Sequence, residues 1–187
     1  MSVTRLIFPY GEAIQWLSPD QTNQLPTSPL TDWLLSNGSL TQKLRSHCVE
    51  FEVKILAEDM LAPFNGECLT ANQSWVREVL LCLDGIPWIF ARTLIPISLF
   101  QQQQFNFVNL GTRPLGELLF SSDTFSLGKI EIAHFTPCHK LTQLLAPLEQ
   151  TPTQELWGRR RYFCHHDEQL IVSEIFLPAA RRLIEAM

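Results

Sequence analysis

Two hydrophobic segments joined by a tight turn form the clearest pattern in the chain. Residues 75–98 read WVREVLLCLDGIPWIFARTLIPIS, and the pair Asp84-Gly85 tolerates the positive backbone angles that a hairpin turn needs. We predict two paired antiparallel strands here. Each strand carries an arginine among apolar residues, Arg77 in the first and Arg92 in the second. A guanidinium stays charged, so in apolar company it must meet an anion or reach water. The hairpin is therefore a candidate floor for a site that binds a small acid.

Alternation of hydrophobic and polar residues predicts a half-buried strand at residues 48–57. Its buried face is expected to hold Val49, Phe51, Val53 and Ile55. Residues 58–74 contain prolines, asparagines and glycine and are predicted to form a loop. Three more strands are expected at residues 124–135, 156–165 and 169–178, with a polar turn before the last one. Together these segments predict an α+β fold with a six-stranded antiparallel sheet.

Short helices are predicted before the first strand. One helix begins at Ser28-Pro29, where serine can cap the helix and proline fits its first turn, and it ends at Asn37-Gly38. A second helix follows Ser39, which has the spacing of a capping box.

The same arrangement of helices is expected again in the middle of the chain. Residues 98–109 are predicted to form a helix, followed by a turn and a short helix at residues 117–120. The residues expected to be buried in the longer helix are Leu99, Phe100, Phe105 and Val108. A terminal helix at residues 179–187 is expected to turn Leu183 and Ile184 inward.

Composition narrows the class of protein. The chain has 187 residues, 45% hydrophobic and 18% charged, which suits one domain over residues 1–187 with a surface arm at residues 1–27. The formal net charge of −5 argues against nucleic acid or an anionic membrane as the main partner. No secretory signal or membrane-spanning segment is recognised, and five irregularly spaced cysteines suggest reduced thiols. We expect a cytoplasmic monomer that binds a small molecule, with no metal and no cofactor.

A glutamate on an apolar strand face is the second unexpected residue. Glu174 shares its predicted face with leucine, valine and phenylalanine side chains. Burial there would raise its pKa and favour a protonated carboxyl that donates a hydrogen bond. The alternative is an internal ion pair with Arg77, Arg92 or one of Arg159–Arg161. The last three arginines alternate in direction along their strand and are expected to be solvated or paired at the surface.

Five segments of the chain carry a family resemblance. They are WVREVLLCLDGIPWIFARTLIP, LGTRPLGELLF, IEIA, ELWGRRRYF and LIVSEIFLPA. In this order they resemble bacterial chorismate pyruvate-lyases, the family that performs the first step of ubiquinone synthesis, over residues 33–179. The resemblance implies a six-stranded antiparallel sheet with helix–turn–helix flaps over an internal ligand site. It also implies a carbon–oxygen lyase that converts chorismate to 4-hydroxybenzoate and pyruvate without a cofactor or a metal.

The resemblance also implies which residues form the site. The arginine that grips the ring carboxylate falls on Arg77, and the acid that meets the ring 4-hydroxyl falls on Glu174. Two flap residues that bind through the main chain fall on Leu40 and Leu115. We expect Arg77 and Glu174 to be catalytic. For Arg92 a role at the side-chain carboxylate or ether oxygen competes equally with that of a structural arginine under the sheet.

Two other functions stay open on sequence grounds. The same fold serves as a non-catalytic effector-binding module in some bacterial transcription regulators, although Arg77 and Glu174 both match the motifs of the enzyme. A related lyase that makes another hydroxybenzoate isomer is the second alternative. The chain departs from the family at Leu40, where methionine is expected, and at residues 134–155, which are longer than the corresponding connection.

Overall fold

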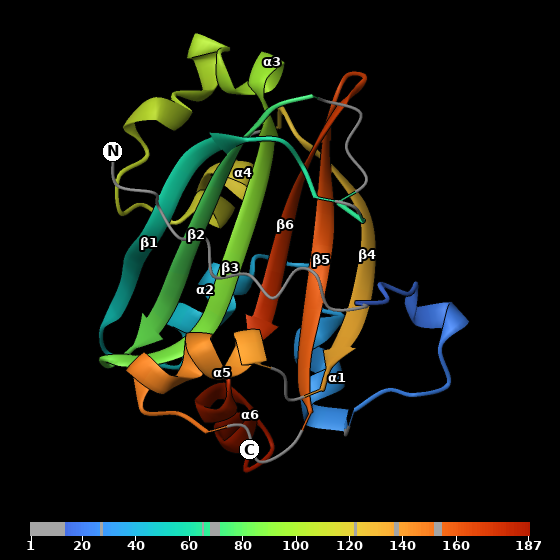
Figure 1. Cartoon of the computed structure of the whole chain (residues 1–187), viewed down its shortest axis with the longest axis vertical. Coiled ribbons are helices and arrows are strands. Elements are labelled where there is room, and N and C mark those ends of the chain that lie inside the picture. The colour runs from blue at the N-terminus through green and yellow to red at the C-terminus, as the bar shows by residue number, and fades with distance from the viewer. Residues whose placement is uncertain are drawn as a thin grey trace.

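Six strands form one antiparallel sheet in the order β1-β2-β3-β6-β5-β4 (Figure 1). The strands are β1 (Phe51–Leu61), β2 (Ser74–Leu83), β3 (Ile86–Pro96), β4 (Ser126–Phe135), β5 (Leu156–His165) and β6 (Glu168–Phe176). The computed structural model describes residues 14–26, 28–64, 66–67, 72–121, 123–136, 139–151 and 155–187, apart from the side chain of Lys140. The predicted α+β fold with a six-stranded antiparallel sheet is confirmed.

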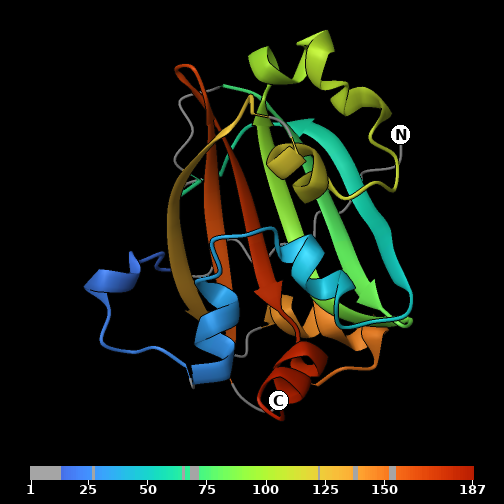
Figure 2. The ribbon, with the colours of Figure 1, turned by 180° about the vertical axis from the view of Figure 1, so that it is seen from behind.

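The helices divide between the two sides of the sheet. One side, here called the flap face, carries α1 (Ser28–Leu34), α2 (Leu40–Arg45), α4 (Leu115–Ser121) and α6 (Pro178–Ile184), all in front of the sheet in Figure 2. The opposite side, the back face, carries α5 (His139–Leu145). The shorter elements are η1 (Pro19–Gln21), α3 (Ile97–Phe100), η2 (Gln103–Phe105), η3 (Phe107–Asn109) and η4 (Ala146–Leu148). Within the described residues, no helix has the length and apolar character needed to cross a membrane.

Both predicted hairpin turns are present. Asp84 and Gly85 have φ angles of 49° and 81°, the left-handed backbone that a two-residue turn requires. His166 has a φ angle of 51° in the turn between β5 and β6. The carboxylate of Asp84 also accepts hydrogen bonds from the backbone N–H groups of Val49 and Glu50, at 3.0 and 2.8 Å. The turn residue therefore also fixes where the chain enters β1.

The strand β1 differs from its prediction in length and in its buried face. It continues to Leu61, through residues that were expected to form a loop. A register shift between Ile55 and Ala57 marks a β-bulge, which moves the inward-facing position by one residue. Val53, opposite Leu81, is buried on the flap face, whereas Ala57, after the bulge and opposite Glu78, is buried on the back face. Ile55 was expected to be buried and is 40% exposed. Val49 lies before the strand and is fully exposed, so its predicted burial is wrong.

The prediction of one continuous helix over residues 98–109 is wrong. The structure has three short turns there, α3, η2 and η3. Asn106 has a φ angle of 50°, and a right-handed helix cannot pass through such a residue. The break changes the phase of the side chains, so that Phe107 is buried and Val108 is 72% exposed.

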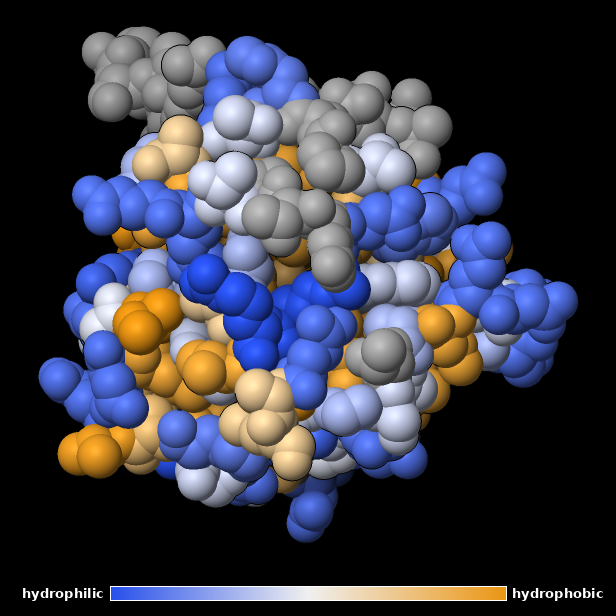
Figure 3. Space-filling view, turned by 90° about the horizontal axis from the view of Figure 1, so that it is seen from below, coloured by the Kyte–Doolittle hydropathy of each residue, from blue (hydrophilic) through white to orange (hydrophobic). Residues whose placement is uncertain are grey.

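The predicted terminal helix is confirmed as α6, but only one of the two residues predicted to point inward is buried. Ile184 is fully buried, whereas Leu183 is 45% exposed. The view from below in Figure 3 shows strongly hydrophilic residues in the middle of this end of the molecule and hydrophobic residues among them. Hydrophobic side chains therefore reach the surface here.

The chain consists of two similar halves. Each half is a helical segment followed by three antiparallel strands, ending in β3 in the first half and in β6 in the second. The strand order places β3 beside β6, as an approximate two-fold axis through the sheet requires. Trp75 and Arg77 on β2 recur with the same spacing as Trp157 and Arg159 on β5. The hairpins β2–β3 and β5–β6 are therefore structural counterparts.

The long connection after β4 packs on the back face. Its helix α5 buries Leu141, Leu144 and Leu145 against side chains of β2, β3 and β6. This places the segment that departs from the family pattern on the side of the sheet away from the flaps.

A buried row of polar side chains crosses the back face. Cross-strand pairing aligns Glu78, Arg92, Ser173, Arg160 and Glu131. Arg92 donates to Glu78 at 2.9 Å and to Glu67 of the β1–β2 connection at 2.7 Å. Arg160 pairs with Glu131, which also accepts from Lys129 at 2.6 Å and from Tyr162 at 3.1 Å. These pairings allow charged residues to be buried on this face.

Replacing Glu131 by glutamine should make the free energy of unfolding less dependent on pH between neutral and acid conditions. Burial raises the pKa of Glu131, but hydrogen bonds from Lys129, Arg160 and Tyr162 together hold it below its ordinary value of 4.5. A lowered folded pKa means that the carboxylate stabilises the fold above the unfolded pKa, and that this stabilisation is lost as pH falls through the folded pKa. We expect Glu131→Gln to reduce the free energy of unfolding at pH 7 by about 3 kcal/mol.

The measurement is urea unfolding of both proteins from neutral to acid pH. The difference between them should shrink as the pH falls, and an equal difference at every pH would contradict the prediction. Glu52→Gln is the control, because Glu52 pairs with Lys54 at 3.4 Å on an exposed surface and should contribute less than about 1 kcal/mol.

Candidate functional site

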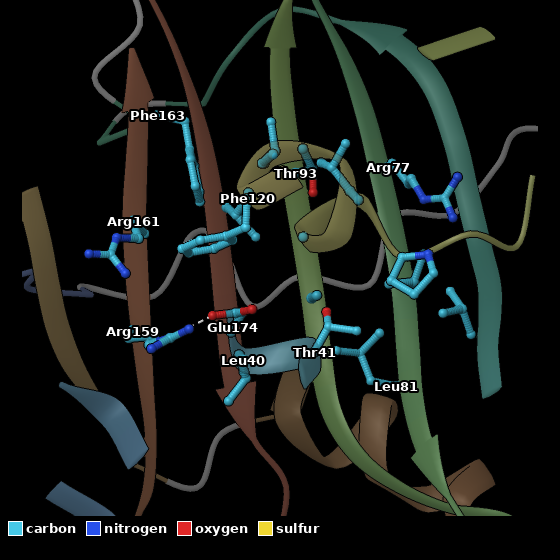
Figure 4. Close-up of a pocket in the computed structure, with 18 residues that line it drawn as sticks. Leu40, Thr41, Arg77, Leu81, Thr93, Phe120, Arg159, Arg161, Phe163 and Glu174 are labelled. Atoms are coloured by element: carbon cyan, nitrogen blue, oxygen red, sulfur yellow. Dashed lines mark hydrogen bonds and ion pairs between the residues drawn. The ribbon is translucent and has the colours of Figure 1, made fainter. Parts of the chain in front are cut away.

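A pocket lies on the flap face between two hydrophobic clusters. One cluster joins the sheet to α1, α2 and α6, and the other joins it to α3, α4 and the turns between them. The sheet forms the floor of the pocket, and α2 and α4 cover it. Its polar lining residues are Thr41, Arg77, Thr93, Arg159, Arg161 and Glu174 (Figure 4). The volume is about 50 Å³, well below the roughly 300–1,000 Å³ of typical ligand pockets. The flaps therefore stand closed over a nearly filled space.

The sheet register places the polar floor residues in two neighbouring rows. One row contains Arg77, Thr93, Val172 and Arg161, and the next contains Val79, Ala91, Glu174 and Arg159. Directly opposed residues of antiparallel strands point to the same face, so these side chains all rise toward the flaps. Arg77 on β2 and Glu174 on β6 are separated by β3, which carries Thr93 between them. The structure thus brings the two predicted residues to one pocket and holds them apart.

Arg77 lies at the β1 side of the pocket and is 2% exposed. Its guanidinium donates to Glu58 at 2.7 Å and to the backbone oxygen of Gly111 at 2.7 Å. Burial lowers the pKa of Arg77, and the charge of Glu58 opposes that shift. Gly111 belongs to the turn before α4, so Arg77 ties this flap to the sheet. Its Nε makes no hydrogen bond to any described residue.

Glu174 forms an ion pair with Arg159. The Nε of Arg159 lies 2.6 Å from Oε2 of Glu174 (Figure 4). Arg159 also donates from Nη1 to the backbone oxygens of Ser36 and Leu34, at 3.0 and 3.4 Å. Of the two interpretations of Glu174, the structure therefore has the internal ion pair. The second oxygen of its carboxylate, Oε1, has no hydrogen-bond donor among the described residues and is an acceptor on the pocket side.

The expectation that Arg159–Arg161 lie at the surface is wrong. All three are buried, with exposures of 2 to 5%. Alternation along β5 places Arg159 and Arg161 on the flap face and Arg160 on the back face. Arg161 donates to the backbone oxygen of Asn37 at 2.8 Å. Burial, and after it the charge of Arg159, lowers the pKa of Arg161, and Figure 4 shows its guanidinium turned away from Glu174.

Arg92 does not reach the pocket. It is the cross-strand partner of Glu78 and Ser173 on the back face, while its neighbour Thr93 faces the flaps. The hypothesis that Arg92 touches the ligand is therefore corrected, and its structural alternative holds. The physical reason is the two-residue period of a strand, because adjacent residues point to opposite faces.

Leu40 and Leu115 are placed at equivalent points of the two flaps. Each is the first residue of its helix, α2 and α4 respectively, and both side chains are buried against the pocket. The first N–H groups of a helix have no partner within the helix. This position agrees with the expectation that both residues bind a ligand through the main chain, which stays a prediction.

Four polar lining residues were missed as site candidates, namely Thr41, Thr93, Arg159 and Arg161. Thr93 lies in the row of Arg77 on β3, and Thr41 comes from α2. Figure 4 shows the hydroxyl groups of both threonines toward the middle of the pocket. Arg159 was considered only as a partner of Glu174, although its place relative to Trp157 repeats that of Arg77 relative to Trp75. That repetition is the signal that could have revealed it.

No metal site is seen in the part of the chain that the structure describes. No group of three or more histidine, cysteine, aspartate or glutamate side chains there is arranged to hold an ion. The polar groups of the pocket are guanidinium, carboxylate and hydroxyl groups. Such a set suits an organic acid that also carries a hydroxyl group.

Comparison of the fold with solved structures finds regulator domains. The effector domain of PhnF from Mycobacterium smegmatis superimposes with a TM-score of 0.57, covering 78% of this chain and 91% of that domain, at 12% identity. This likeness concerns the fold alone.

Comparison of the sequence finds much nearer relatives. A chain from Shewanella loihica, named probable chorismate pyruvate-lyase, is 64% identical over 187 residues, covering 100% of both chains. One of the same name from Psychromonas ingrahamii is 38% identical and covers 93% of this chain and 95% of the relative. The family described as chorismate lyase matches residues 11–184. The chain belongs to the chorismate lyase family.

Proposed function

We propose that this lyase converts chorismate to 4-hydroxybenzoate and pyruvate by breaking a carbon–oxygen bond. The observation that carries the proposal is the placement of Arg77 and Glu174 at opposite sides of one closed pocket in a chain of this family. We further propose that it acts as a cytoplasmic monomer and supplies ubiquinone synthesis, as the resemblance implies.

The substrate is bound between the two sides of the pocket. Arg77 binds the ring carboxylate through its Nε, which no described residue occupies. Glu58, whose side chain is 37% exposed, turns toward solvent and frees Nη1 of Arg77 for the ligand. The backbone N–H groups of Leu40 and Leu115 complete the carboxylate site from the flaps. Glu174 accepts a hydrogen bond from the ring hydroxyl through Oε1. Charge-assisted hydrogen bonds of this kind fix the orientation of the ring.

The reaction needs no co-reactant. The bond between ring carbon C3 and the ether oxygen breaks, the hydrogen on C4 is lost, and the ring becomes aromatic. The departing enolate takes up one proton and becomes pyruvate, so atoms and charge balance. The protein therefore has to hold the reactive conformer and stabilise negative charge on the leaving oxygen. Buried guanidinium groups supply positive charge where water is excluded.

The flaps meet each other above the pocket and must part for ligand exchange. A methyl group added to Gly116 of α4 would lie 2.9 Å from Oγ1 of Thr41 on α2, so the two helices are in close contact. Arg45 and Glu117 form an exposed ion pair between the same helices at 2.8 Å. Together with the small cavity, these contacts predict that flap opening limits the release of the product.

The direct test is to incubate the purified protein with chorismate and to separate the products by chromatography. Formation of 4-hydroxybenzoate and pyruvate in equal amounts supports the proposal. Tight binding without turnover would instead indicate an effector-binding module. A different hydroxybenzoate isomer would indicate a related lyase.

Arg77→Ala should abolish turnover without unfolding the protein. The substitution removes the charge that holds the ring carboxylate, and we expect kcat/KM to fall by about 100-fold or more. Circular dichroism checks that the variant is folded. Arg182→Ala, an arginine exposed on α6, is the matched control and should retain activity. Normal turnover by folded Arg77→Ala would refute the assignment.

Gly116→Ala should speed product release and weaken product binding. The added methyl group would clash with Thr41 and push the flaps apart. We therefore expect the affinity for 4-hydroxybenzoate to fall by about 5-fold or more. Stopped-flow fluorescence measures the release rate. Gly38→Ala is the control in the turn between α1 and α2, because an added methyl group there meets nothing within 4 Å.

A second variant removes the Thr41 side chain that the added methyl group would contact. Thr41→Ala in the Gly116→Ala background relieves the contact and should restore slow release. If the double variant releases product as fast as Gly116→Ala, contact between the flaps is not the cause.

A further inference from the structure

The two halves of the chain contribute equivalent arginines to one pocket. Arg77 on β2 and Arg159 on β5 both line it, and each lies two residues after a tryptophan, Trp75 or Trp157. Each arginine also holds the flap of the other half. Arg77 donates to the turn before α4, and Arg159 donates to the end of α1. Arg77 is proposed to bind the ring carboxylate. Its structural counterpart, Arg159, has not yet been matched to any group of the ligand.

Arg159 has a free donor on the pocket side. Its Nε is used by Glu174 and its Nη1 by backbone oxygens of the α1–α2 turn. Its Nη2 makes no hydrogen bond to any described residue, although the side chain is only 2% exposed. A terminal guanidinium nitrogen carries two N–H donors, so Nη2 can donate to a ligand in the pocket that Arg159 lines. Figure 4 shows the guanidinium of Arg159 directed toward Glu174 and not away from the pocket.

The chemistry of the substrate places a second anion beside Glu174. Chorismate carries two carboxylates, one on ring carbon C1 and one on the enolpyruvyl ether at C3. The ether carbon C3 is adjacent to the hydroxyl carbon C4. If the hydroxyl meets Glu174, the ether and its carboxylate lie next to that residue, and Arg159 is the cation in contact with it at 2.6 Å.

The other arginines are less suited to this role. Arg161 lines the pocket and its Nε is buried without a partner among the described residues. Its guanidinium is nevertheless turned away from Glu174 and donates to Asn37. Arg92 lies on the back face with Glu67 and Glu78. Apart from Arg161, the described pocket lining still has two arginines, Arg77 and Arg159, against the single glutamate Glu174, and this excess of positive charge suits an anionic ligand.

We propose that Arg159 binds the carboxylate of the enolpyruvyl group, the part of the substrate that leaves. Arg159 is thus a second anchor that the product, with one carboxylate, does not use. The inference rests on the proposed function, because it takes chorismate as the substrate. It makes Arg159 a determinant of specificity for a dicarboxylate over a monocarboxylate.

The test compares two stable ligands that differ only in the second carboxylate. One is 3-(1-carboxyethoxy)-4-hydroxybenzoate, and the other is its side-chain carboxamide. Calorimetry measures both affinities for the wild-type protein, Arg159→Gln and Arg159→Lys. The wild type should prefer the carboxylate, and Arg159→Gln should reduce that preference by about 10-fold to 100-fold. Arg159→Lys keeps the charge and should lose less of the preference.

The affinity ratio separates binding from positioning. If Arg159 only orients Glu174 and the flap, Arg159→Gln weakens both ligands equally and the ratio is unchanged, which would overturn the inference. Arg161→Gln is the matched control, since Arg161 also ties β5 to the α1–α2 turn, and it should keep the wild-type ratio. Equal binding of the two ligands by the wild type would also overturn the inference and needs no variant.

Failure of the proposed function would be seen separately. A wild-type protein that forms no 4-hydroxybenzoate from chorismate refutes the proposed reaction, whatever the calorimetry shows. A protein that turns over chorismate but whose ligand preference ignores Arg159 refutes only the second anchor.

Discussion

The burial of arginine side chains in the sheet is the constraint on which the structure depends. Five arginines of the described chain are buried, namely Arg77, Arg92, Arg159, Arg160 and Arg161. Because a buried guanidinium needs partners for its donors, each recruits carboxylates or backbone oxygens. On the back face the partners are mainly the carboxylates of Glu67, Glu78 and Glu131. On the flap face they include backbone oxygens of the segments that carry the flaps, so the pocket charges also hold its cover in place.

The two arginines that we propose as ligand anchors also hold the flaps. Arg77 contacts the turn before α4, and Arg159 contacts the end of α1. A ligand anchored on either side chain is bound to a residue that also fixes a flap. Closure of the flaps excludes water, which strengthens the interaction of the guanidinium groups with a buried anion. The same closure leaves little free volume in the pocket. The flaps would therefore have to open for substrate to enter and for product to leave.

The approximate two-fold symmetry of the fold supplies equivalent positions, and side-chain differences between them make the pocket directional. Arg77 faces Thr93 across its hairpin, whereas Arg159 faces Glu174. One side therefore offers a cation beside a hydroxyl group, and the other offers a cation beside a carboxylate. On the flaps, Thr41 of α2 opposes Gly116 of α4. Under the proposed function, these differences would fix which end of a hydroxylated ring acid lies at each side of the pocket.

The sequence alone determined the sheet and its turns, because strand periodicity and turn chemistry are local. The Asp84-Gly85 turn, the six strands and the placement of Arg77 on an apolar strand follow from neighbouring residues. The inward phase of β1 beyond Ile55 did not, because a bulge in pairing with β2 sets it. Nor did Phe107, which is buried because the backbone turns at Asn106.

Only the tertiary structure decided which charges share a space. Arg77 and Arg92 look alike in the sequence, yet cross-strand pairing sends one to the pocket and the other to the back-face network. Arg159 becomes the partner of Glu174 because β5 and β6 are neighbours in register. The face of a strand that receives the flaps depends on packing between distant segments, and no local pattern along the chain encodes it.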